Sequence, residues 1–231
     1  MAISTSLGYE DLGELLTLLT GDEKHEPSAL STLDVIWVLY DRVLNVDPSR
    51  MDDPDRDRFL LSKGHGPAAF YAVLAAKGFF PVETLAGFGS FDSPLGYHPD
   101  RALVPGAEIS SGSLGHGLGL ALGVALGLDA QERSDPRVFC LLGDAELEEG
   151  SNFEAIQLAG RLALGRLRAV VIDNHSSAHG WPGGIARRFE LEGWSAVTVS
   201  GRDHDAIEQA FAAAPGNRPH MVVADIPEGE R

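Results

Sequence analysis

The chain has 231 residues, of which 44% are hydrophobic, and its formal net charge at pH 7 is −16. The length and hydrophobic content suit a single domain with a sizeable core, whereas the acidic charge argues against nucleic acid or an anionic membrane as a partner. The only cysteine, Cys140, excludes a disulfide framework. The sequence has neither a secretory signal nor a long apolar span, so we expect a cytoplasmic protein that does not cross a membrane.

Two helices and a loop are predicted in the first quarter of the chain. Residues 9–19 (YEDLGELLTLL) are amphipathic at the helical period. The sequence Ser31-Thr32-Leu33-Asp34 resembles a capping box, which predicts that a second, strongly apolar helix begins there. Residues 45–56 are polar and acidic and contain prolines, as is typical of a solvated surface loop.

A short strand and a glycine turn come next. Residues 58–61 (RFLL) form an apolar run of strand length, and residues 62–66 (SKGHG) follow it as a turn. The glycines on either side of His65 would let the backbone approach a ligand closely. Farther along the chain, Pro81 is placed to open a short helix.

Residues 110–128 (SSGSLGHGLGLALGVALGL) predict a helix. Glycines recur in it every four residues, at positions 115, 119, 123 and 127, and form a ridge without side chains along one side of the helix. Each interior glycine disfavours a helix by about 1 kcal/mol relative to alanine. We therefore expect this ridge to pack closely against another helix, either within the chain or across subunits.

The centre of the chain predicts a strand, a helix and a second strand over residues 138–142, roughly 152–164, and 168–172. Two strands joined in this way lie parallel, and ligands bind beyond the carboxyl ends of such strands. Asp144 and Asn174 follow the two strands, and their oxygens are ligands that Mg2+ prefers. Taken alone, the two residues would favour a turn at one strand end and a helix cap at the other over a metal site.

Residues 196–200 and 221–226 predict further strands, and residues 203–214 predict a helix between them. The alternation of strands and helices predicts an α/β fold, a doubly wound and mostly parallel sheet flanked by helices. No linker interrupts the sequence, so we expect one domain over residues 1–231.

The stretch from Gly143 to Asn174 resembles the thiamine diphosphate motif, in which GDG is followed about thirty residues later by Asn. GDA stands here in place of GDG, and the match extends to EG at 149–150 and EA at 154–155. More broadly, residues 10–226 resemble the N-terminal half of a transketolase. The resemblance implies thiamine diphosphate and Mg2+ as cofactors, bound by the diphosphate module of the family's fold.

The resemblance also implies a role for each motif residue. Asp144, Asn174 and the backbone carbonyl of Ser176 would bind Mg2+. The residues implied to contact the cofactor are His65, Gly112, Leu114, Gly143, Asp144, Ala145 and Asn174. The residues implied to act in catalysis are His25, His65 and His98, together with Glu149 and Glu154, which correspond to carboxylates that link paired active sites at the family's subunit interface. For His116, which stands where the family has Gln, a role near the cofactor and no role remain equally open.

Nothing in the chain resembles the family's pyrimidine-binding domain. The resemblance therefore implies the N-terminal subunit of a split transketolase, active only with a C-terminal partner subunit in an α2β2 assembly, which moves a two-carbon ketol unit from a ketose to an aldehyde. The segment between Asn174 and Arg188 is shorter than usual, so two alternatives stay open: thiamine-dependent transfer to a carrier protein or specialised metabolite, and a non-catalytic interaction subunit. A nicotinamide-binding protein is disfavoured because GxGxxG does not follow the first strand.

Overall fold

The computed structural model describes residues 7–19, 26–64, 67–214 and 216–227, with the backbone alone for residues 26–29. His25 and His65, two of the three predicted catalytic histidines, lie outside the described residues. Among the described residues, no helix combines the length and the apolar character that crossing a bilayer requires.

Five strands form one sheet in the order β1-β2-β3-β5-β4, and each neighbouring pair is parallel. The strands are β1 (Arg58–Leu61), β2 (Val138–Gly143), β3 (Leu167–Asp173), β4 (Ser195–Ser200) and β5 (His220–Asp225). The predicted doubly wound, parallel α/β fold is confirmed. The register pairs Gly143 with Ile172 and Asp173 with Asp225, so β2, β3 and β5 end side by side.

The central strands are buried on both faces, which explains why β2 is apolar throughout rather than alternating. Successive residues of each strand point to opposite faces of the sheet. Phe139 and Leu141 belong to one hydrophobic cluster, whereas Val138, Cys140 and Leu142 belong to the other. The sheet therefore separates two cores, and helices must cover both.

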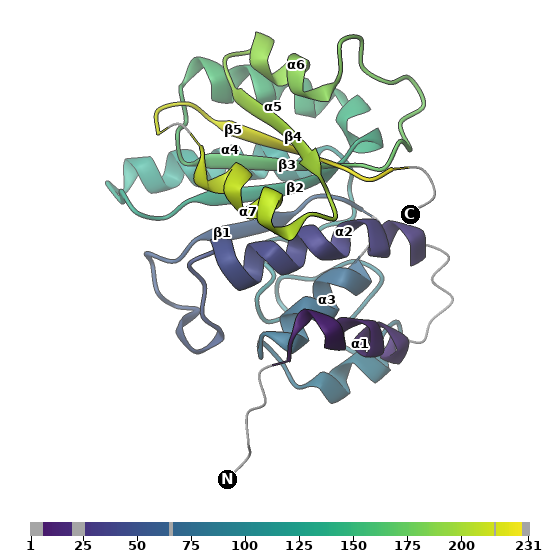
Figure 1. Ribbon diagram of the computed structural model, residues 1–231. Helices are drawn as coiled ribbons and strands as arrows, with labels where there is room; N and C mark the ends of the chain where they lie inside the picture. The colour runs from purple at the N-terminus through teal and green to yellow at the C-terminus, as the bar shows by residue number, and fades with distance from the viewer. Residues whose placement is uncertain (1–6, 20–25, 65–66, 215, 228–231) are drawn as a thin grey trace.

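Helices α4, α5 and α6 cover one face of the sheet, and α2, α3 and α7 lie on the other, with α1 packed outside α3 (Figure 1). The helices are α1 (Leu12–Leu18), α2 (Glu26–Val38), α3 (Pro67–Ala76), α4 (His116–Ala130), α5 (Gly150–Arg161), α6 (Ile185–Leu191) and α7 (His204–Ala212). Shorter helical turns are η1 (Tyr9–Asp11), η2 (Leu39–Val43), η3 (Pro48–Arg50), η4 (Val82–Gly87) and η5 (Ala145–Glu148). Pro81 opens a helical turn as expected, because it is the N-cap residue of η4.

The predicted capping box is wrong. Ser31 and Asp34 lie inside α2, which is already helical at Glu26. Asp34 is buried, and its carboxylate instead accepts hydrogen bonds from Tyr9, Arg202 and His204. Donors from three distant residues therefore bind the side chain that the sequence pattern had assigned to a helix cap.

The glycine ridge lies on α4, and Gly115 at its start packs against Glu149 and Ser151, but the other three glycines pack against no other described part of this chain. A Cβ atom added at Gly119, Gly123 or Gly127 would meet nothing within 4 Å. The expectation of a helix pair within the chain is therefore wrong for the described residues. The close approach occurs instead in the first turn of α4, where a Cβ atom on Gly117 would lie 2.2 Å from the Cβ atom of Ser62.

Candidate functional site

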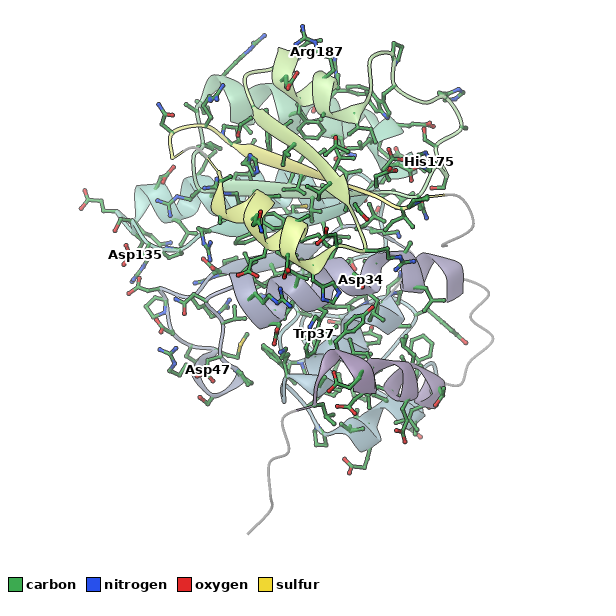
Figure 2. All side chains as sticks on the ribbon, in the orientation of Figure 1. Asp34, Trp37, Asp47, Asp135, His175 and Arg187 are labelled. Atoms are coloured by element: carbon green, nitrogen blue, oxygen red, sulfur yellow. The ribbon has the colours of Figure 1, made fainter. Side chains whose placement is uncertain are left out.

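Asp144 and Asn174 lie at the carboxyl ends of the neighbouring strands β2 and β3, as the sequence predicts. In Figure 2, His175 is labelled on the side of the molecule toward which the arrowheads of β4 and β5 point in Figure 1. This edge of the sheet is where ligands bind in open α/β folds.

The carboxylate of Asp144 is held in one orientation. Asp144 is 1% exposed. Its Oδ1 atom accepts the Ser176 hydroxyl at 2.6 Å, and its Oδ2 atom accepts the backbone N–H groups of Ser176 at 2.6 Å and Ser177 at 2.9 Å. Each carboxylate oxygen has about two lone pairs, so one on Oδ1 remains for a cation.

Asn174 supplies a second oxygen. The residue is 9% exposed, and its Oδ1 atom is buried without a hydrogen-bond partner. A buried polar atom left unpaired costs free energy, and such atoms in a native protein need an explanation, for example an ion. The chemistry of Asp144 and Asn174 therefore fits a hard cation such as Mg2+. Ser176, the third predicted ligand, directs its backbone N–H and its hydroxyl toward Asp144.

The substitution of alanine for the second glycine of the motif causes no backbone strain. Ala145 is the first residue of η5 and is not among the residues with positive φ. Only a positive φ would favour glycine there. Gly143 also has no positive φ, and a Cβ atom on it would lie 3.5 Å from the Lys63 side chain, which is an ordinary contact.

His98, Gly112 and Leu114 come together on neighbouring loops. His98 is exposed, and a Cβ atom on Gly112 would lie 2.7 Å from its ring, so this close approach depends on glycine. The φ of Gly112 is +120°, which also favours glycine. Leu114 lies over Gly64, where an added Cβ atom would be 2.9 Å from the leucine methyl group. The predicted cofactor loop thus meets both the residue before His65 and the predicted substrate histidine.

Glu149, Glu154 and His116 are exposed, on or near the first turns of α4 and α5. Glu149 lies against Gly115, the N-cap residue of α4, where an added Cβ atom would be 2.6 Å from the glutamate Cβ. The exposure of the two glutamates leaves them accessible to another protein chain.

Two buried charged residues near Asp144, namely Lys63 and Glu146, were not predicted from the sequence to belong to the site. Burial lowers the pKa of Lys63 to about 8, against the opposing influence of the Asp144 and Glu146 carboxylates. The Lys63 ammonium donates to Thr32 Oγ1 at 2.8 Å and to Ser31 Oγ at 3.2 Å. Burial likewise raises the pKa of Glu146. No spacing in the sequence connects residues 31, 63 and 146, so only the fold identifies this group.

The loop after Asn174 is hydrogen-bonded to η5. The Glu148 carboxylate accepts the Ser177 hydroxyl at 2.5 Å and the His179 N–H at 3.0 Å, and these hydrogen bonds lower its pKa. A cavity of about 260 Å³ beside this loop has Asp144 and Trp181 in its lining. The shortened loop is therefore ordered by contacts to the segment that carries the motif.

Three further side chains at this edge could hold a cation: Asp173, His175 and Asp225 offer ligand atoms within 4.8 Å of one another. His175 Nε2 lies 3.0 Å from Asp225 Oδ1, and the two strands that carry the aspartates are paired in register. Sequence reasoning did not connect these residues because Asp225 is about fifty positions away. A larger cavity, of about 810 Å³, lies at the end of β4 around Asp34 and Arg202, away from the predicted ligands.

Comparisons with known proteins bear on this site. A family model described as "Transketolase, thiamine diphosphate binding domain" matches residues 19–226. The protein named Ferredoxin fas2 from Rhodococcoides fascians is 53% identical over 222 residues, which cover 96% of this chain and 73% of that protein. A protein from Actinobacillus succinogenes, named as one of the subunits of an apulose-4-phosphate transketolase, is 33% identical over 89% of this chain and 76% of its own length.

Solved transketolases have a similar structure. The transketolase from Leishmania mexicana superposes with a TM-score of 0.78 at 26% identity, covering 95% of this chain and 36% of that one. A transketolase mutant from Pichia stipitis in complex with fructose 6-phosphate gives a TM-score of 0.75 at 30% identity, covering 86% and 35%. The chain thus spans about a third of the length of these transketolases.

Proposed function

Because the chain belongs to the transketolase thiamine diphosphate-binding domain family, we propose that it is the diphosphate-binding subunit of a two-component transketolase. Residues 1–231 form one cofactor-binding domain in this proposal. A C-terminal subunit supplies the pyrimidine-binding domain, and the two chains assemble as α2β2. The relatives support this division, because the protein from Actinobacillus succinogenes is itself named as one component of a transketolase and this chain covers 76% of it.

The observation that carries the proposal is the pair of oxygens at adjacent strand ends. Asn174 Oδ1 is buried without a hydrogen-bond donor, and Asp144 Oδ1 keeps a lone pair at the end of the neighbouring strand. These two atoms, with the carbonyl of Ser176, would hold Mg2+, and the backbone N–H of Ala145 would donate to the diphosphate. A protein that had lost its cofactor would have no reason to keep an unpaired buried acceptor.

When bound, thiamine diphosphate would supply the electron sink, its thiazolium ring, for the electron pair released as the ketose C–C bond breaks. The protein supplies binding, orientation and proton transfer. His98 is exposed above Gly112, at the mouth of the site, and would exchange protons with substrate hydroxyl groups. Imidazole suits this work because its unperturbed pKa is about 6.5. His25 and His65 complete the proposed set.

The outer faces of α4 and α5 support the assembly. Gly119 and Gly123 leave the surface of α4 bare, and Leu120, at 47% exposure, lies beside them. Leu158 and Leu162 on the neighbouring α5 are exposed as well. Exposed apolar area of this kind marks interaction surfaces, and a glycine ridge lets a second helix approach closely. We assign this face to contact with another subunit of the assembly.

The donor and acceptor are small sugars or oxo compounds in this proposal. The loop at 175–184 would border the substrate, and its short length keeps open the alternative of transfer to a specialised metabolite or a carrier protein. The name of the ferredoxin relative does not extend to these residues, because iron–sulfur clusters require several thiolates and the single Cys140 is buried.

Reconstitution tests the proposal. The purified chain, mixed with thiamine diphosphate, Mg2+ and a candidate C-terminal subunit, should consume a ketose donor in the presence of an aldehyde acceptor. Failure of the complex to bind the cofactor, with no turnover across a panel of donors, would favour the alternative of a non-catalytic interaction subunit that has lost cofactor binding.

A further inference from the structure

One buried carboxylate joins three segments that the proposed function places around the cofactor. The segments are the turn after β1 (residues 62–64), the entry to α4 (residues 112–117) and the motif turn after β2 (residues 143–145). The carboxylate belongs to Glu146 in η5, which is 2% exposed.

Each segment contributes a donor to this carboxylate. Glu146 Oε1 accepts the Ser62 hydroxyl and the Gly115 N–H, the latter at 2.9 Å, and Oε2 accepts the Gly143 N–H at 3.3 Å. Ser62 Oγ in turn accepts the Gly117 N–H at 3.0 Å. The donors lie 84, 31 and 3 residues from Glu146 along the chain, so no local structure would bring them together without it.

The segments that supply these donors are also packed tightly against one another. Gly117 lies so close to Ser62 that an added Cβ atom would be 2.2 Å from the serine Cβ, and Gly115 has a φ of +82°. The segments therefore touch directly. Because the donors are buried, a lost acceptor would leave them unsatisfied, at the full desolvation cost.

The chemistry of the side chain also matters. A carboxylate accepts on both oxygens, so it can serve three donors at once. The isosteric amide of glutamine accepts on one oxygen only and would turn its NH2 group toward a donor. The buried ammonium of Lys63 supplies the nearby positive charge that makes a buried carboxylate tolerable.

We propose that Glu146 is a positioning residue, which holds the three segments in the arrangement that receives the diphosphate without touching the cofactor. The inference rests on the proposed function, because that function places residues 112, 114, 143 and 145 against the cofactor. It adds a residue that the motif does not contain and that acts through the backbone of the others.

Hydrogen exchange on the full chain without cofactor tests the positioning itself. Glu146→Gln should accelerate exchange by tenfold or more in all three segments together, at a temperature where the variant remains folded. The matched control is Asp57→Asn. Asp57 is also a buried carboxylate, but it accepts the N–H groups of Asn45 and Arg137 at the amino end of the sheet. Faster exchange confined to residues 143–146, or equal changes in the control, would overturn the inference.

Cofactor affinity provides the second readout. Calorimetry on the complex with the C-terminal subunit, titrated with thiamine diphosphate and Mg2+, should show at least tenfold weaker binding for Glu146→Gln and for Ser62→Ala, and unchanged binding for Asp57→Asn. A merely structural role would lower the stability of all three variants and leave the affinity of the folded complex alone. Unchanged affinity in Glu146→Gln would overturn the inference. Absence of binding by the wild-type complex would overturn the proposed function itself, and the positioning role in cofactor binding with it.

Discussion

Ser176 donates both its backbone N–H and its hydroxyl to the carboxylate of Asp144, each at 2.6 Å. The loop after β3 is thereby fastened to the residue that follows β2. The two contacts orient the carboxylate and leave one oxygen with a lone pair, beside the unpaired oxygen of Asn174. The pair of proposed metal ligands is thus built before a cation arrives, which lowers the cost of ordering the site on binding.

The first prediction concerns the metal. Asp144→Ala removes one of the two side-chain oxygens, so Mg2+-dependent binding of thiamine diphosphate by the assembled complex should weaken by about 100-fold or more, or about 2.8 kcal/mol. Calorimetry with and without Mg2+ measures this. Asp225→Asn is the matched control, because Asp225 ends the strand next to β3 and forms part of the separate Asp173–His175–Asp225 group. An equal loss in the control would place the cation in that group instead.

The second prediction concerns the glycine ridge. Gly119→Leu should prevent assembly with the partner subunit, because the added side chain occupies the surface that another helix must approach. The isolated chain should be no less stable, since the side chain meets open space and leucine favours a helix by about 0.8 kcal/mol over glycine. Sedimentation and thermal melts check both parts. Gly13→Leu, at an equally open helical site in α1, should leave assembly intact. A complex of unchanged size and affinity with Gly119→Leu would show that the ridge is simply exposed.

The third prediction concerns the division of the active site. The chain alone, with cofactor and Mg2+, should transfer no ketol unit from any ketose, because in the proposed assembly the pyrimidine-binding domain belongs to the C-terminal subunit. Activity should appear when the C-terminal subunit is added. It should then fall by at least tenfold in His98→Ala and in His65→Ala, consistent with the usual contribution of a general acid or base, while the complex stays intact by sedimentation. Turnover by the chain alone, free of contaminating transketolase, would refute this prediction.

The fourth prediction uses the buried lysine. The folded-state pKa of Lys63 is about 8, against an ordinary value of 10.5. Between these values the unfolded chain binds more protons than the folded one, so stability should rise with pH across this window. Each pH unit is worth about 1.4 kcal/mol, so the contribution of Lys63 should grow by about 3 kcal/mol from pH 8 to pH 10.5.

Lys63→Met isolates this contribution, because all other titratable groups are common to the two proteins. Urea unfolding should show that the stability of the wild type rises relative to that of the variant as the pH increases from 8 to 10.5. Below pH 8 the difference should be constant. A difference that stays flat across the whole range would mean that the ammonium is not destabilised by burial.

Much of the fold was predictable because it depends on local patterns. The apolar runs at 58–61 and 138–142 became β1 and β2 within one residue, since an apolar segment of that length between turn residues can be buried only as a strand. The strand–helix–strand order then required parallel pairing, which placed Asp144 and Asn174 together at one edge of the sheet. These conclusions needed only the pattern of apolar residues, the spacing of the elements and the handedness of the strand–helix–strand crossover.

The sequence by itself therefore determined the α/β architecture and the two oxygens at the strand ends, because the order of the strands and helices and the hydrophobic periodicity are properties of the sequence. Only the tertiary structure decided which distant groups meet. The hydroxyl of Ser62 reaches Glu146 across 84 residues, Asp34 accepts hydrogen bonds from three long-range donors rather than capping a helix, and three glycines of α4, at positions 119, 123 and 127, face open space. Such contacts depend on how helices and strands pack in three dimensions, and no local pattern contains that information.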